Sequence, residues 1–94
     1  MPMLDLTGRT ALLTGASGGI GGAIAHRLAA QGARLAVSGS SLERLAAVSV
    51  ATGAVPLPCN LADASETDAL VPRALEALGG LDILVHNAGI TRDG

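Results

Sequence analysis

Hydrophobic and polar positions along the chain change their spacing several times, and glycine-rich or polar stretches separate the segments. Thr10–Thr14 is a short apolar run of the kind found in buried strands. The next apolar positions recur at helical spacing and are Ile24, Ala25, Leu28 and Ala29. This pattern predicts a strand followed by a helix that stops at Gly32, since glycine is a common residue just past a helix end.

A second strand and helix are predicted from the following residues. Arg34–Ser38 is the next apolar run, and Ser40 with Glu43 three residues later fits a capping box. We therefore expect Ser40 to be the N-cap of a helix over residues 41–51.

A third strand and helix follow. Residues 55–59 are apolar but include Pro56 and Pro58, and proline cannot donate a hydrogen bond to a sheet ladder, so an edge position is expected. Asp63 with Glu66 predicts the start of a third helix, which should close at Gly79 and Gly80. Its apolar stripe consists of Leu70, Val71, Ala74, Leu75 and Leu78.

Residues 82–85 form the last apolar run and are predicted to be a fourth strand. Strands that alternate with helices in this way are typical of an α/β protein with a parallel sheet. The pattern therefore predicts an α/β fold built from successive strand–helix units.

Composition narrows the class of protein. The 94 residues are 49% hydrophobic and 15% charged, which predicts one core-forming domain and excludes a disordered chain. The formal net charge of -2 gives no basic surface for nucleic acid, and the absence of aromatic residues removes stacking platforms for single strands. Nucleic acid is not an expected partner.

Cysteine content and apolar run length indicate the compartment. A single cysteine, Cys59, cannot form an internal disulfide and is expected to pack in the core of a protein from a reducing compartment. No apolar run reaches the roughly 18 residues of a membrane span, and the first residues do not form a signal peptide. We expect a cytoplasmic protein without a membrane association.

A glycine cluster lies between the first strand and the first helix. Gly15, Gly19 and Gly21 would let the backbone turn sharply and approach an anion, and the helix start would add free N–H donors. Such a cluster can also be a tight turn and nothing more. A lysine-dependent phosphate loop is excluded, because all six basic residues are arginine.

Two motifs resemble those of the short-chain dehydrogenase/reductase family. The run over residues 14–21 closely resembles the family's cofactor motif, and His86, Asn87, Ala88 and Gly89 resemble its Asn-Asn-Ala-Gly with histidine first. Residues 90–94 are similar to the stretch found in 3-oxoacyl-[acyl-carrier-protein] and acetoacetyl-CoA reductases. The resemblance covers essentially all of the chain but only the first half of a family member.

The resemblance implies a fold. We expect a Rossmann-type, doubly wound parallel sheet with strand order 3-2-1-4, with the first two helices on one face and the third on the other. Residues 1–94 would be the N-terminal part of a single NAD(P)-binding domain, truncated after the fourth strand.

The resemblance also implies a cofactor site. Its expected residues are Gly15, Ser17, Gly18, Gly19, Ile20 and Gly21 at the pyrophosphate and adjoining ribose, Asn60 and Leu61 at the adenine, and Asn87, Ala88 and Gly89 at the ribose. Asn60 stands where the family usually has aspartate, and its amide can still exchange hydrogen bonds with adenine.

Gly39 and Ser40, at the end of the second strand, should select between the two nicotinamide dinucleotides. An acidic side chain there would bind a ribose 2′-hydroxyl and repel a 2′-phosphate. This chain has no carboxylate at either position, so NADP, as NADPH, is the expected cofactor. The arginine that many NADP-dependent relatives carry at position 40 is missing, and Ser40 is also explained as a plain helix cap.

The other ionisable residues have structural explanations. His26 is expected on the solvent face of the first helix, and His86 in a hydrogen bond at the sheet end. The acids Asp63, Glu66, Asp68 and Glu76 fit helix caps and a solvated helix face. Two histidines and one cysteine so far apart give no metal-ligand spacing, so no metal is expected.

The implied activity is NADPH-dependent reduction of a 3-oxoacyl thioester on acyl-carrier protein in fatty acid biosynthesis, by a full-length homotetramer. The family's catalytic tyrosine, lysine, serine and asparagine fall outside this chain, which contains neither tyrosine nor lysine. We therefore expect no catalytic residue in the chain, whose part is cofactor binding. Two alternatives stay open: a reductase or dehydrogenase for a CoA thioester, sugar or steroid, and a dinucleotide-binding module without catalysis.

Overall fold

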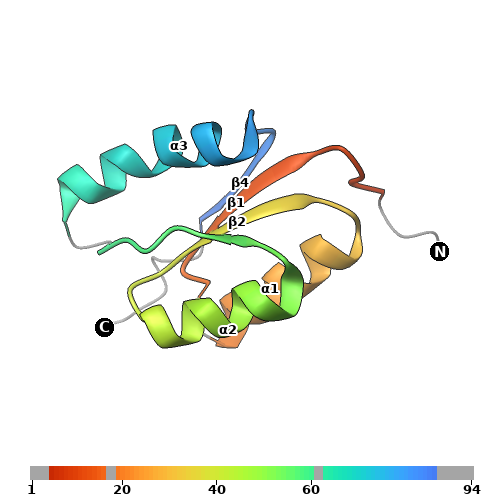
Figure 1. Ribbon diagram of the computed structural model, residues 1–94, viewed down its shortest axis with the longest axis horizontal. Coiled ribbons are helices and arrows are strands. Elements are labelled where there is room, and N and C mark those ends of the chain that lie inside the picture. The colour runs from red at the N-terminus through yellow and green to blue at the C-terminus, as the bar shows by residue number, and fades with distance from the viewer. Residues whose placement is uncertain (1–4, 17–18, 61–62, 87–94) are drawn as a thin grey trace.

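A parallel sheet with helices on both faces makes up the computed structural model, which describes residues 5–16, 19–60 and 63–86 (Figure 1). The elements in chain order are β1 Thr10–Thr14, α1 Gly19–Ala30, β2 Arg34–Ser38, α2 Leu42–Thr52, β3 Val55–Pro56, α3 Ala64–Leu78 and β4 Ile83–His86. The strand order is β3-β2-β1-β4, and every pairing is parallel. This confirms the predicted α/β fold and strand order.

Each face of the sheet buries its own set of side chains. Ala11 and Leu13 of β1 belong to a cluster with α1 and α2 residues, whereas Leu12 belongs to a cluster with α3 residues. Successive side chains of a strand point to opposite faces, so β1 serves both clusters and is buried along its whole length. Figure 1 shows the predicted layers, with α1 and α2 below the sheet and α3 above it.

Helix α2 begins one residue later than predicted. Its N-cap is Ser41, whose hydroxyl accepts a hydrogen bond from Arg44 N at 3.4 Å, so the prediction of Ser40 as N-cap is wrong. Both serines are good capping residues. Because the buried run of β2 continues through Gly39, the helix begins after Ser41 and not after Ser40. Ser40 is exposed and lies outside the helix end.

Helix α3 has both of its predicted ends. The Asp63 side chain caps the start, accepting from Ser65 N at 2.9 Å and Glu66 N at 3.4 Å. At the other end Gly79 has a φ of 78° and donates to Leu75 O at 2.9 Å. This left-handed conformation is one that glycine adopts without steric cost.

The outer strands differ from their predicted bounds. β3 has its predicted edge position but covers only Val55–Pro56, because Pro58 has no N–H to extend the ladder. Single backbone bonds still continue the pairing, from Leu57 N to Val37 O and from Cys59 N to Gly39 O. β4 begins at Ile83, one residue later than expected.

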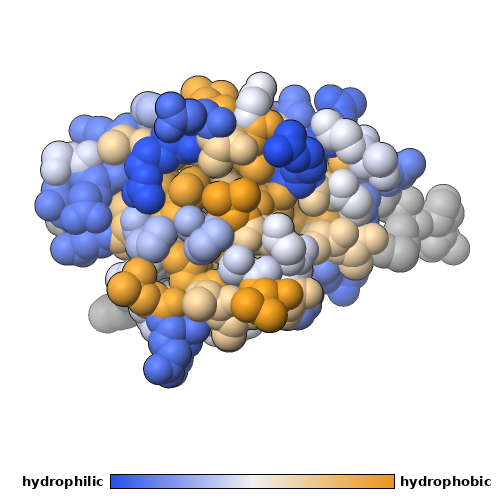
Figure 2. All heavy atoms as spheres, viewed as in Figure 1, coloured by the Kyte–Doolittle hydropathy of each residue, from blue (hydrophilic) through white to orange (hydrophobic). Residues whose placement is uncertain are grey.

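The two outer helical surfaces differ in polarity. Figure 2 shows hydrophilic side chains over α3 and apolar side chains over α2, where Leu42 and Val50 are exposed. Across the part of the chain that the structure describes, none of the helices has the length and apolar character needed to cross a membrane.

Candidate functional site

The candidate site lies where the carboxyl ends of β1 and β2 meet the starts of α1 and α2. All strands are parallel, so their carboxyl ends share one edge of the sheet. In open α/β sheets this edge is where ligands bind. The predicted residues Gly15, Gly39 and Asn60 all follow strand ends on this edge.

The turn after β1 depends on two glycines that face each other. Gly15 has a φ of 74°, a conformation that side chains disfavour. A Cβ at Gly21 would collide with the Gly15 carbonyl oxygen and would lie 2.8 Å from Ala16 Cα. The first turn of α1 can therefore pack against this loop only because position 21 has no side chain.

Gly19 differs from Gly21 although both belong to the same motif. A Cβ built at Gly19 meets no atom within 4 Å, so the backbone at the first residue of α1 borders open space. The N–H groups of the first helical turn lack partners within the helix and favour an anion. The exposed neighbour Ile20 adds an apolar side chain at the same helix start.

The loop is also tied to the neighbouring strand. Ala16 N donates to Ser38 O at 2.8 Å, and Ala16 itself is fully buried. This bond fixes the glycine turn beside the end of β2, where the residues expected to select the cofactor begin. The predicted residues Ser17 and Gly18 lie outside the described residues.

A second part of the site forms between β2 and the segment after β3. Cys59 N donates to Gly39 O at 3.2 Å, which places Asn60 next to the end of β2. Gly39 is buried, whereas Ser40 and Asn60 are exposed. The structure thus brings together the positions predicted for the adenine and its ribose, while the predicted Leu61 lies outside the described residues.

Ser38 is a residue that the sequence analysis missed. Its side chain is fully buried, and its Oγ has no hydrogen-bond partner among the described residues. Buried hydroxyls in proteins are nearly always paired, so this one is an unusual feature at the end of β2. The sequence did contain a signal for this residue, because Ser38 is a polar residue at the last position of an apolar run that predicts a buried strand.

The end of β4 is joined to the end of β1 by side chains. Thr14 Oγ1 and His86 Nδ1 lie 2.9 Å apart, in hydrogen-bond contact, which confirms the predicted structural role of His86. The predicted residues Asn87, Ala88 and Gly89 follow directly in the sequence and lie outside the described residues.

Two acidic side chains, Asp63 and Asp82, stabilise a helix start and the start of a strand. Hydrogen bonds from Ser65 hold the pKa of Asp63 below its ordinary value. Hydrogen bonds from the Thr10 backbone and hydroxyl do the same to the pKa of Asp82, at the opposite edge of the sheet from the candidate site. Both carboxyls are therefore accounted for by local structure.

Neither the histidines nor the cysteine builds a metal centre here. His26 is exposed on α1, as predicted, and Cys59 is 3% exposed within the core, also as predicted. In the ranges 5–16, 19–60 and 63–86, no group of three or more histidine, cysteine or acidic side chains is placed to hold a metal ion.

These features fit a dinucleotide. Open space at Gly19 and the free N–H groups at the α1 start suit a pyrophosphate. No carboxylate at positions 39 and 40 opposes a phosphate there.

Comparison with known proteins gives the family. A family described as short chain dehydrogenase matches residues 9–94. Nodulation protein G of Rhizobium meliloti (strain 1021) is 54% identical over 94 residues, covering 98% of this chain and 38% of the relative. The 3-oxoacyl-[acyl-carrier-protein] reductase of Rickettsia conorii is 50% identical over 93 residues, covering 97% of this chain and 37% of the relative.

A solved structure agrees with these sequence matches. A short chain dehydrogenase from Burkholderia cenocepacia J2315, in complex with NADP, superposes with a TM-score of 0.88 at 47% identity. The match covers 96% of this chain and 39% of that protein, so the chain spans well under half the length of its relatives. The chain belongs to the short-chain dehydrogenase family of nicotinamide-dependent oxidoreductases.

Proposed function

We propose that the chain supplies the cofactor-binding part of an NADPH-dependent reductase that converts 3-oxoacyl-[acyl-carrier protein] to the 3-hydroxyacyl form in fatty acid biosynthesis. Residues 1–94 would form the N-terminal part of one NAD(P)-binding domain. Two facts support a role in cofactor binding without catalysis. The chain covers only 38% and 37% of the two relatives named above, and it contains neither tyrosine nor lysine.

One observation carries the choice of NADPH. The end of β2 has a buried glycine and an exposed serine at positions 39 and 40. A carboxylate at this place would repel a ribose 2′-phosphate, whereas the exposed hydroxyl of Ser40 can donate a hydrogen bond to it. The NADP bound in the Burkholderia relative is consistent with this proposal.

The chain's own residues would bind and orient the cofactor. When bound, NADPH supplies the hydride that reduces the keto carbon. Backbone N–H groups at the start of α1 would hold the pyrophosphate beside Gly19, and Gly39 and Asn60 would flank the adenosine. The proton that the product oxygen needs has no donor tyrosine in this chain, so that step is assigned to residues beyond it.

The choice of substrate rests on relatives. The Rickettsia protein is named as a 3-oxoacyl-[acyl-carrier-protein] reductase, and residues 90–94 resemble the same group. Nodulation protein G is equally similar to the chain. A second candidate function is therefore that of a short-chain reductase for another carbonyl substrate, such as a CoA thioester, a sugar or a steroid. A cytoplasmic location and a homotetramer complete the proposal and rest on the same resemblance.

Titration and kinetics test the proposal in two steps. NADPH should bind the chain, and Gly19→Val should weaken that binding sharply without unfolding the protein, because position 19 borders open space. Parental affinity in a folded Gly19→Val variant would show that the site is wrongly placed.

The full-length protein should then oxidise NADPH only in the presence of a 3-oxoacyl thioester, and the 94-residue chain should show no turnover. Activity with another carbonyl class alone would favour the second candidate. Dinucleotide binding without any turnover in the full-length protein would favour a non-catalytic module.

A further inference from the structure

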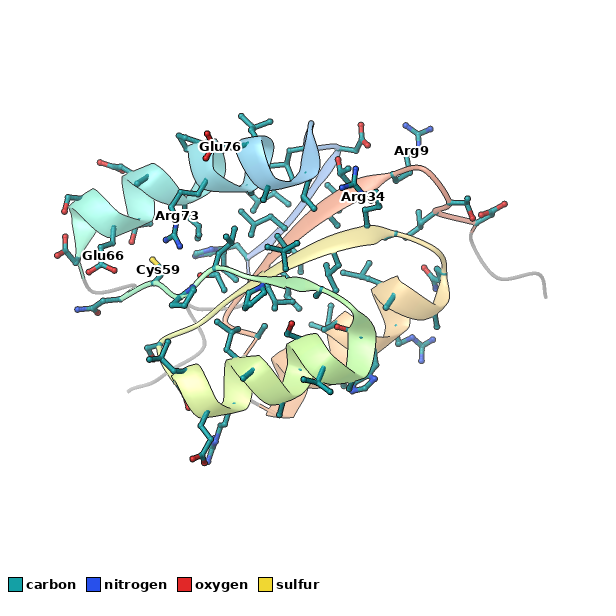
Figure 3. All side chains as sticks on the ribbon, viewed as in Figure 1. Arg9, Arg34, Cys59, Glu66, Arg73 and Glu76 are labelled. Carbon is teal, nitrogen blue, oxygen red and sulfur yellow. The ribbon has the colours of Figure 1, made fainter. Side chains whose placement is uncertain are left out.

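The segment that leads from β3 to α3 is held by two charged side chains of α3. Arg73 Nη1 donates to Pro58 O at 2.9 Å, and Glu66 Oε1 accepts from Asn60 N at 3.0 Å. Figure 3 shows both side chains extending from α3 toward the segment that carries Cys59. Glu66 was expected to complete the cap of α3, and it binds Asn60 instead.

The same segment is fixed from the sheet side. Cys59 N donates to Gly39 O at 3.2 Å, and the Cys59 side chain is buried in the cluster that contains Leu70 and Ala74 of α3. Asp63 N, at the start of α3, donates to Asn60 O at 2.9 Å. Residues 58–60 therefore lie between β2 and α3, with bonds to both.

The hydrogen bonds made by Glu66 and Arg73 hold residues 58–60 where regular strand pairing is missing. β3 ends at Pro56, and Pro58 cannot donate a backbone hydrogen bond, so sheet pairing alone fixes this segment only at Leu57 and Cys59. Holding an exposed residue such as Asn60 in one conformation has an entropic cost. Bonds that are already made in the free protein remove that cost from ligand binding.

We propose that Glu66 and Arg73 are positioning residues for the adenosine half of the dinucleotide site. They hold residues 58–60 so that Asn60 stays beside Gly39, and neither side chain itself touches the cofactor. This inference rests on the proposed function, because it assigns Asn60 and Gly39 to that half of the site.

The experiment separates the two halves of the cofactor. In the full-length reductase, Glu66→Ala and Arg73→Met should weaken binding of adenosine 2′,5′-bisphosphate, measured by calorimetry, by about threefold to tenfold, the scale of one net hydrogen bond. The KM for NADPH should rise by a similar factor with kcat unchanged. Kinetics with reduced nicotinamide mononucleotide, which lacks adenosine, should stay as in the parent.

A conservative variant and two controls isolate the cause. Glu66→Gln keeps an acceptor oxygen and should retain most of the parental affinity. Arg34→Met removes the 2.8 Å bond from Arg34 Nη1 to Leu78 O at the far end of α3 and should lower stability without changing affinity. Glu76→Gln, on the part of α3 that points away from the segment, should change neither property (Figure 3).

Two results overturn the inference alone: parental affinity in both Glu66→Ala and Arg73→Met, or an equal loss of affinity in Arg34→Met, which would indicate general loosening of α3. Failure of the parent itself to bind NADPH or the bisphosphate would instead overturn the proposed function and this inference with it.

Discussion

The hydroxyl of Thr14 and Nδ1 of His86 lie 2.9 Å apart although the two residues are 72 positions apart in the chain. Thr14 ends β1 and His86 ends β4, and the two are register partners in neighbouring parallel strands. A threonine hydroxyl can donate or accept, so it can pair with either neutral tautomer of the histidine. The contact joins the carboxyl end of β1 to the carboxyl end of β4.

Replacing His86 with alanine should lower the free energy of unfolding by about 0.5–1.5 kcal/mol, the usual net value of one hydrogen bond. Chemical denaturation measures this change. His26→Ala is the matched control, because His26 is exposed on α1 and should have no comparable effect. Equal stability of the two variants would mean that the contact with Thr14 contributes nothing.

Gly21→Ala should destabilise the protein by about 1–3 kcal/mol, the range found when a side chain is forced into a filled space. Its Cβ would collide with the Gly15 carbonyl and force α1 away from the loop. Gly19→Ala provides the comparison, because a Cβ there meets no atom within 4 Å. Thermal denaturation of both variants measures the difference, and similar melting temperatures would contradict the packing described for Gly21.

Gly39→Asp should shift cofactor preference from NADPH toward NADH. The new carboxylate would stand at the end of β2 and repel a 2′-phosphate, and a tenfold change in the preference ratio corresponds to about 1.4 kcal/mol. The ratio of kcat/KM values for the two cofactors in the full-length protein measures the shift. A parent protein that already prefers NADH would refute the reasoning from Gly39 and Ser40.

Asp82 should make stability depend on pH in the acid range. Hydrogen bonds from Thr10 hold its pKa below the ordinary value of 3.8 in the folded protein, with Arg9 adding a smaller charge effect. A lowered folded pKa means that the stabilisation is present above pH 3.8 and is lost as the pH falls through the folded pKa. The charged form is therefore the one that folding favours.

Urea unfolding of the parent and of Asp82→Asn measures this dependence. Asp82→Asn should be less stable than the parent at neutral pH, and the difference should shrink as the pH falls below 3.8. Asp68→Asn, at an exposed position of α3, should follow the parent throughout. A difference between parent and Asp82→Asn that is the same at every pH would exclude this titration.

Local rules were enough to predict the elements, whereas the order of the sheet was expected from the resemblance to a known family. Apolar spacing located α1 and α3, and the side chain of Asp63 caps α3 as its sequence position indicates. The start of a helix was less predictable where two adjacent residues could both act as its N-cap. The adjacent Ser40 and Ser41 offer the same capping chemistry, and only the way β2 runs into α2 decides between them.

The contacts that shape the candidate site were harder to predict because they join distant segments. Glu66 looks like a capping residue when its own helix is considered alone, and its bond to Asn60 depends on how α3 lies over the sheet. The buried hydroxyl of Ser38 is likewise visible only when both sheet faces are packed. Sequence patterns report such tertiary relationships poorly, since they describe one element at a time.

The bond from Cys59 N to Gly39 O uses backbone atoms only, so it does not depend on which side chains occupy these positions. During evolution, residues 39, 40 and 60 can therefore be exchanged while their arrangement persists. Gly21 has no such freedom, because any side chain there meets the Gly15 carbonyl. If residues 39 and 40 select the cofactor as proposed, single substitutions can change that choice, whereas the packing of Gly21 against Gly15 keeps the turn after β1 constant.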